Sequence, residues 1–195
     1  MKNMPKDQLL QLIKTRRSVY PHMYTEELIS REIVMEILEA ARWAPTHKHT
    51  EPWRFKVFAG EARQRLGIFL AEKYKEITPS EKYLERKYKK ALKNPVRASH
   101  VIAICMQRDP EEAIPEWEEI AAVAMAVQNM WLTCHAYGIG CYWSSPKTFV
   151  NEREFLHLRE GERCLGILYM GYPKDGLELT GEREEMSGKV EIISN

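Results

Sequence analysis

Two adjacent arginines and a serine near the start of the chain form the first group with chemical potential, Thr15-Arg16-Arg17-Ser18. They follow a segment from Asp7 to Thr15 whose apolar residues have helical spacing. A guanidinium offers a planar fork of hydrogen-bond donors and a serine hydroxyl adds another, which together suit a phosphate group. The same residues at an exposed helix end would also complement the helix dipole, so the motif alone leaves a purely structural role open.

A second group lies in the segment from Ala44 to Phe55, which contains two prolines, two histidines and a tryptophan. It joins an expected helix to an expected strand, and its prolines restrict the backbone. Such a loop can present amides and an imidazole rigidly to a flat polar ring. His47 and His49 could also serve as metal ligands, but no further His, Asp or Glu stands at ligand spacing, and we predict no metal site.

A third group spans Tyr137 to Pro146. Its two glycines resemble part of a dinucleotide-binding fingerprint, but Trp143 occupies the third glycine position and the segment follows a helix instead of opening one. A helix cap followed by a core strand explains both glycines. Ser144 and Ser145, just beyond that strand, are placed to meet a polar ligand.

Other catalytic motifs are absent from the sequence. It contains no G-x-S-x-G nucleophile motif, no P-loop and no H-E-x-x-H motif. Because no side chain stands out as acid, base or nucleophile, the pattern favours a reaction whose difficult step belongs to a cofactor.

The elements that must position these groups alternate between helices and strands. Apolar periodicity predicts helices at residues 7–15, 31–44, 61–77, 81–93, 117–137 and 151–159, and strands at 55–58, 101–106, 139–143 and 164–172. Ser30 and Gly138 are the expected caps of the second and fifth helices. No repeat or linker divides the chain, so we predict a single α+β domain over residues 1–195.

The composition limits the class of protein. Lys and Arg number 29 against 28 Asp and Glu, which argues against a nucleic-acid or membrane-surface protein because those partners favour a basic excess. The N-terminal segment Met1–Asp7 lacks the apolar core of a signal peptide, and no apolar run approaches the roughly 20 residues of a membrane span. We therefore expect a cytoplasmic protein with reduced, structural thiols at its four cysteines, Cys105, Cys134, Cys141 and Cys164.

Taken in order, these segments resemble the FMN-dependent nitroreductase family, and in particular its small bacterial branch. The resemblance rests on R-R-S at 16–18, A-P-T-H-K-H-T-E-P-W-R-F at 44–55, P-x-W-E at 115–118, G-I-G-C-Y-W-S-S at 138–145 and L-G-I-L-Y-M-G-Y-P at 165–173. It implies a three-layer α+β fold with a central mixed β-sheet of roughly four or five strands flanked by helices. It also implies a homodimer with FMN at the subunit interface.

By the same resemblance, Arg16 and Ser18 would bind the FMN phosphate and ribityl chain, with Arg17 close to the flavin. Relatives often place a basic residue near the C-terminus on the phosphate, and Arg183 is the candidate here. Two departures leave phosphate binding to Arg16 and Arg17: Tyr20 stands where many relatives have Arg or Lys, and Ser144 stands where the small branch has Arg.

The flavin ring itself would be lined by residues from both subunits. The resemblance implies that Pro45, Thr46 and His47 reach it from the partner subunit, with Trp43 near its edge. Trp143, Ser144 and Ser145 would line it from the subunit that supplies Arg16.

The resemblance also implies a ping-pong reaction that moves a hydride from NADH or NADPH through FMN to a nitroaromatic, a quinone or a similar small oxidised molecule. We assign no catalytic side chain. Two alternatives stay open: a specialised flavin enzyme of the same fold, such as a dehalogenase or dehydrogenase, or a non-catalytic binding protein that uses the seven Lys and Arg residues between positions 82 and 97.

Overall fold

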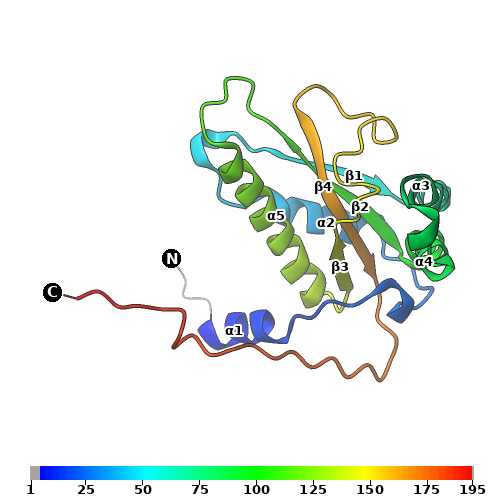
Figure 1. Cartoon of the computed structure of the whole chain (residues 1–195). Helices are drawn as coiled ribbons and strands as arrows, with labels where there is room; N and C mark the ends of the chain where they lie inside the picture. Colours follow the sequence, from blue (N-terminus) through cyan, green and yellow to red (C-terminus); the bar gives the residue numbers. More distant parts are fainter. Residues whose placement is uncertain (1–4, 195) are drawn as a thin grey trace.

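Four strands form the central sheet in the order β1-β2-β4-β3, and each neighbouring pair is antiparallel. The structure, a computed structural model, describes residues 5–194; the first four residues, which belong to the segment where the sequence predicts no signal peptide, and Asn195 lie outside the described part. The strands are β1 (Trp53–Phe58), β2 (His100–Gln107), β3 (Gly140–Ser144) and β4 (Glu162–Gly171) (Figure 1).

The described strand ladders differ from the mixed sheet that the family resemblance implied. Two helices in succession, α3 (Glu61–Ile77) and α4 (Glu85–Arg97), connect β1 to β2. A pair of helices returns the chain to the end of the sheet at which β1 finished, so β2 runs antiparallel to β1, whereas a single connecting helix would make the strands parallel. Among the described residues, a parallel pairing occurs at an isolated bridge between Ser18 and Cys141, outside the strand ladders.

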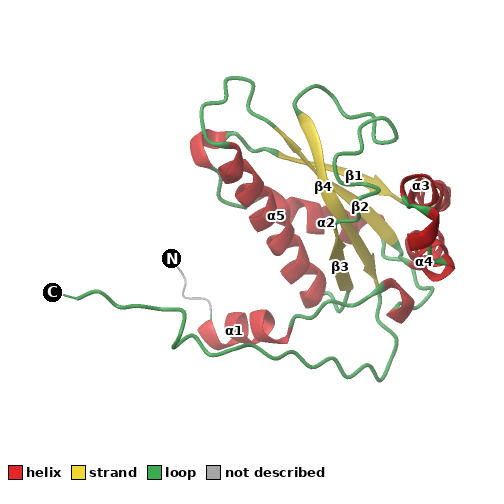
Figure 2. Ribbon diagram, viewed as in Figure 1, coloured by secondary structure: helices red, strands yellow, loops and turns green. Residues whose placement is uncertain are grey.

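One face of the sheet is covered by α2 (Arg31–Arg42) and by the long helix α5 (Glu116–Ala136) (Figure 2). Because side chains alternate between the two faces of a strand, every second residue of β2 packs under these helices: Ile102, Ile104 and Met106. The sequence predicted a helix over residues 117–137, and α5 confirms it; its fully buried positions, from Val123 to Cys134, belong to the core.

The opposite face of the sheet packs against α3 and α4. Here the alternate residues of β2 (Val101, Ala103 and Cys105) meet Leu66 and Leu70 of α3. The helices therefore form two layers with the sheet between them, and the expected α+β class and three-layer arrangement are confirmed.

Two helix ends follow the capping residues that the sequence predicted. The Ser30 hydroxyl accepts a hydrogen bond from the amide of Ile33 and begins α2. At the end of α5, Gly138 has a φ of +69°, and the amides of Gly138 and Ile139 donate to the carbonyl oxygens of His135 and Cys134. This cap turns the chain directly into β3.

The remaining helices are short, and α1 stands apart from the sheet. α1 (Lys6–Thr15) contacts α5, and the described C-terminal segment runs beside α1 without forming a helix or strand (Figure 1). Within residues 5–194, three 3-10 helices occupy Pro21–Met23, His47–His49 and Ser80–Lys82.

The helix predicted over residues 151–159 is wrong, because this segment consists of turns. Asn151, the expected helix start, has a φ of +65°, and its amide donates to the carbonyl of Cys164 instead. Phe155 then stacks on Phe69 of α3 with ring centroids 4.2 Å apart. Long-range packing thus outweighs a local helical signal that was only one or two turns long.

The four cysteines are free and buried, as expected. Over residues 5–194, no helix has the length and apolar character needed to cross a membrane.

Candidate functional site

Three arginines gather where α1 ends and the C-terminal segment passes. The guanidinium of Arg16 lies 4.6 Å from the ring centroid of Trp131, near the end of α5. Arg17 folds back to donate to the carbonyl oxygens of Lys14 and Arg16 at 2.6 and 2.8 Å. Burial lowers the pKa of Arg16, and the charges of Arg183 and Arg17 lower it further, so the three guanidiniums are near enough to repel one another.

No carboxylate among residues 5–194 forms an ion pair with any of these three arginines. In addition, Nη1 of Arg16 and Nε of Arg17 are buried without a hydrogen-bond acceptor in the described structure. Buried donors are normally satisfied, and like charges held together are unfavourable without a counter-charge. The cluster therefore fits an anion with several acceptor oxygens, such as a phosphate group.

His135 belongs to the same place, although the sequence gave no reason to select it. Its Nε2 lies 2.8 Å from the hydroxyl of Thr15. Burial lowers the pKa of His135, followed by the charges of Arg16 and Arg17. The signal that could have found it is its position one turn after Trp131 on α5, the face that meets the arginines.

Ser18 lies beside the free edge of β3. It bridges Cys141, and the amide of Val19 donates to the Cys141 carbonyl oxygen at 2.9 Å. This close approach requires Gly140, because a Cβ there would lie 2.6 Å from Cβ of Val19. The chain thereby places Ser18 against the strand that leads to Trp143 and the two serines after it.

The hydroxyls of Ser18, Ser144 and Ser145 are available to a ligand. Ser145 is exposed, and Ser18, Trp143 and Ser144 are half-buried. Within the described residues these three hydroxyls have no hydrogen-bond partner. The structure thus brings Arg16, Arg17, Ser18 and Arg183 into one region. β3 starts beside this region and leads from it to Ser144 and Ser145.

The loop containing Pro45, Thr46 and His47 lies at the other end of α5. His47 Nδ1 is 2.6 Å from a carboxylate oxygen of Glu118, in the first turn of that helix. The Thr46 hydroxyl accepts from the amide of Glu51 at 3.1 Å. Trp43 is 73% exposed and donates from Nε1 to Glu39.

This loop holds an unusual backbone. Lys48, His49 and Glu51 have φ values of +50°, +55° and +41°, a region that residues with side chains rarely adopt. Strain of this kind persists only where surrounding contacts enforce it, and it gathers at ligand and active sites. The loop therefore holds a constrained backbone, in keeping with its two prolines.

The two groups of predicted site residues cannot meet within one chain. The loop is tied to Glu118 and Arg16 packs on Trp131, thirteen residues further along α5. At 1.5 Å of rise per residue, these points are about 20 Å apart along the helix.

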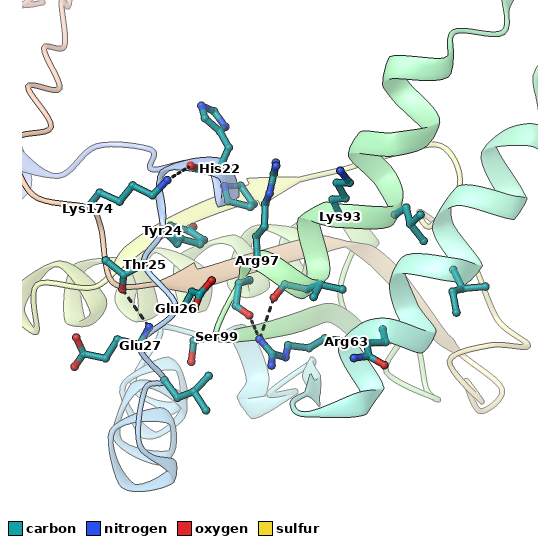
Figure 3. A pocket seen from close by; sticks show the side chains of 17 residues that line it. His22, Tyr24, Thr25, Glu26, Glu27, Arg63, Lys93, Arg97, Ser99 and Lys174 are labelled. Carbon is teal, nitrogen blue, oxygen red and sulfur yellow. Dashed lines mark hydrogen bonds between the residues drawn. The ribbon is translucent and has the colours of Figure 1, made fainter.

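Another cavity lies away from these residues. It has a volume of about 950 Å³ and is bounded by residues 21–28, α3, the end of α4 and Lys174 (Figure 3). None of the predicted site residues lines this cavity. The guanidinium of Arg63, which does line it, donates hydrogen bonds to the carbonyl oxygens of Val96 and Ala98. A smaller cavity of about 490 Å³ adjoins the arginine cluster and is lined by Arg17, Trp131 and His135.

Comparison with known proteins places the chain in a family. The sequence model of the Nitroreductase family matches residues 13–172. The Escherichia coli protein named "Putative NAD(P)H nitroreductase YdjA" is 30% identical over 167 residues, which cover 85% of this chain and 88% of that protein.

Solved structures agree. The crystal structure of a nitroreductase-like family protein from Bacillus cereus aligns over 100% of both chains, with 30% identity and a TM-score of 0.80. The FMN-dependent nitroreductase NfnB from Mycobacterium smegmatis, solved in complex with NADPH, shares the fold with a TM-score of 0.77 at 19% identity, over 97% of this chain and 99% of that one. Because the family model and a 30% identical relative each cover most of its length, the chain is a member of the nitroreductase family.

Proposed function

We propose that this protein is an FMN-dependent oxidoreductase that transfers a hydride from NADH or NADPH to a nitroaromatic, a quinone or a similar small oxidised molecule. Its family membership and the names of its relatives support this reaction class. Relatives of the same fold are described as FMN-bound or FMN-dependent, and one was solved with NADPH.

The observation that carries the proposal is the arginine cluster without a described carboxylate. Arg16 and Arg17 each hold a buried donor that lacks an acceptor, and the phosphate of FMN would supply acceptors for both. Arg183 would add a third charge, and Ser18 a hydroxyl, beside the phosphate. Trp143, Ser144 and Ser145 would line the cofactor along the end of β3.

When bound, FMN supplies the electron-transfer chemistry, because it can accept a hydride equivalent and pass the electrons to a second molecule. The contribution of the chain is to bind, to orient and to exclude water. We assign no side chain the role of acid or base. Parallel lines in double-reciprocal plots of initial rate would support the ping-pong order.

A homodimer is part of the proposal, because the two groups of site residues lie at opposite ends of α5. Pro45, Thr46 and His47 of one subunit would complete the site that begins at Arg16 of the other. Apolar side chains on α1 and on the C-terminal segment are exposed in the single chain. Leu9, Leu10 and Ile13 are 41–47% exposed, and Ile192 and Ile193 are each 86% exposed. Exposed apolar residues on neighbouring helical turns, as on α1, are typical of protein interfaces.

The free cysteines suit a reducing compartment, and we propose that the protein acts in the cytoplasm.

The test is the affinity of the apoprotein for FMN, measured by quenching of flavin fluorescence. Arg16→Gln removes charge-assisted hydrogen bonds worth about 1.5–3 kcal/mol, so Kd should rise about 10- to 100-fold. Arg86→Gln removes an exposed charge on α4 and is the matched control, with an expected Kd equal to that of the wild type. Equal FMN affinity in the Arg16 variant and the wild type would disprove the phosphate assignment.

A further inference from the structure

A cavity of about 430 Å³ lies between α3, α4 and the turn that follows β3. Its volume is within the range of small-molecule sites, about 300–1,000 Å³. Apolar groups form much of its wall, including Leu70, Ile77, Ala91 and Pro146. The cavity is therefore suited to the apolar body of a small organic molecule.

The charges around this cavity have one sign. Lys82, Lys87, Lys90 and Lys147 line it, and its lining contains no Asp or Glu. None of these four lysines is in an ion pair with a residue of the described chain, whereas the neighbouring Lys89 pairs with Glu85 at 3.4 Å. A concave apolar wall with a positive rim attracts anions.

Asn94 provides an independent observation. It lies on α4, lines the cavity and is only 7% exposed. Its side-chain amide makes no hydrogen bond to any described residue, although its backbone carbonyl accepts from Ala98. The polar atoms of this amide are not among the buried atoms that lack a partner, so they are open to the cavity, where the carboxylate of a ligand would accept a hydrogen bond from the amide.

We propose that this cavity binds a small organic carboxylate with a flat apolar body, held by the lysines of α4 and by the amide of Asn94. Ser144 lines the same cavity and belongs to the predicted FMN site, so the bound molecule would lie next to the cofactor. Resting on the proposed function, this names the substrate class: aromatic carboxylates that carry a reducible group. For a nitro group, NAD(P)H gives a hydride, solvent gives a proton, and one oxygen leaves as water to yield the nitroso compound and NAD(P)⁺.

Binding is tested without turnover. Isothermal titration calorimetry of the purified FMN-loaded protein compares 2-naphthoate with its neutral isostere 2-naphthamide. The wild type should prefer the carboxylate. Lys87→Gln/Lys90→Gln and, separately, Asn94→Leu should each weaken binding of the carboxylate by about 10- to 100-fold, the loss expected for a hydrogen bond to a charged group. Binding of the amide should change little in the lysine variant.

Lys89→Gln is the matched control, since Lys89 lies on the same helix, is exposed and does not line the cavity. The lysine variant changes only exposed side chains, so it decides the question even if Asn94→Leu fails to fold. Equal binding of naphthoate and naphthamide to the wild type, or an equal loss in the Lys89 control, would overturn the proposal.

Turnover separates this proposal from the proposed function. With 4-nitrobenzoate and 4-nitrobenzamide as oxidants, the lysine variant should lose kcat/KM only for the carboxylate. A protein that binds no FMN would refute the proposed function, while calorimetry with naphthoate on the same protein would still decide whether the cavity takes carboxylates. If both oxidants lose kcat/KM equally, the cavity does not select for charge and the inference is wrong.

Discussion

At the scale of single residues, Arg16 shows how a binding group can be held ready. Its guanidinium packs over the ring of Trp131, an arrangement that orients the charge without neutralising it. An ion pair with a carboxylate would have consumed the donors that an incoming phosphate needs. The ring of Trp131 thus positions the Arg16 guanidinium, while the charges of Arg17 and Arg183 leave it in need of a counter-charge.

His135 gives a prediction with a defined pH dependence. Burial and then Arg16 and Arg17 lower its pKa from the ordinary value of 6.5. The unfolded chain therefore takes up the proton more readily than the folded protein, so the contribution of His135 to stability is complete above pH 6.5 and declines as the pH falls below it. An anion at the arginine cluster would offset the two positive charges and raise the pKa of His135.

NMR titration of the imidazole signal, with and without inorganic phosphate, measures this linkage. Phosphate should move the midpoint upward, and Arg16→Gln should move it upward in the absence of phosphate. A midpoint that responds to neither change would mean that no anion binds beside His135.

At the scale of elements, periodicity located long helices well. The predicted helix from 61 to 77 has the bounds of α3, and the bounds of α5 differ from the prediction by one residue at each end. The predicted helix from 81 starts later, at Glu85, because residues 80–82 form a 3-10 helix and the amide of Leu84 donates to the hydroxyl of Tyr74. The apolar periodicity of the sequence indicates that a helix exists, and tertiary contacts determine the residue at which it begins.

The candidate site was less accessible to sequence reasoning than the fold. The composition of residues 15–18 suggested a phosphate site, but the approach of Arg183 depends on the path of an irregular C-terminal segment that has no periodicity. The role of Asn94 was equally hidden, because an Asn in a charged helix is ordinarily exposed. Asn94 is nevertheless only 7% exposed, on a helix that packs against α3.

The contact between α3 and α4 gives a stability prediction. Gly67 faces α4 so closely that a Cβ would overlap the carbonyl oxygen of Leu92. Alanine normally favours a helix over glycine by about 1 kcal/mol, but Gly67→Ala should instead lower the free energy of unfolding by about 1–3 kcal/mol, because it overpacks the helix pair.

Urea denaturation followed by circular dichroism measures the change in the free energy of unfolding. Gly188→Ala is the matched control, since nothing lies within 4 Å of a Cβ at that position, and it should leave stability nearly unchanged. A stabilised Gly67 variant would show that α3 and α4 are not held at this distance in solution.

At the scale of the whole molecule, the proposed site depends on two copies of the chain. Arg16 and the loop from Pro45 to His47 lie at opposite ends of α5, so each subunit would contribute the arginines to one site and the loop to the other. A defect in one group therefore leaves the other group of the same chain intact.

Mixed dimers test this arrangement. One chain carries Arg16→Ala, and the other carries Thr46→Gly together with His47→Gly. Each parent homodimer should bind FMN weakly at both sites, while the mixed dimer should hold one site with two unaltered groups and bind FMN there as tightly as the wild type. Differently tagged chains, co-expressed and purified in sequence, allow the FMN content to be measured. A mixed dimer that binds no better than its parents would show that the loop of one subunit does not complete the arginine site of the other.

The segment from Arg16 to Val19 also covers the outer edge of β3 through the Ser18 bridge and the hydrogen bond from Val19 to Cys141. Uncovered strand edges recruit strands from other molecules and start aggregation. A chain that lacks the residues before Tyr20 would lose the proposed anion-binding arginines. It would also expose the unpaired backbone groups of β3 beside a buried apolar core. One short peptide would therefore protect the strand edge and also carry the proposed phosphate site.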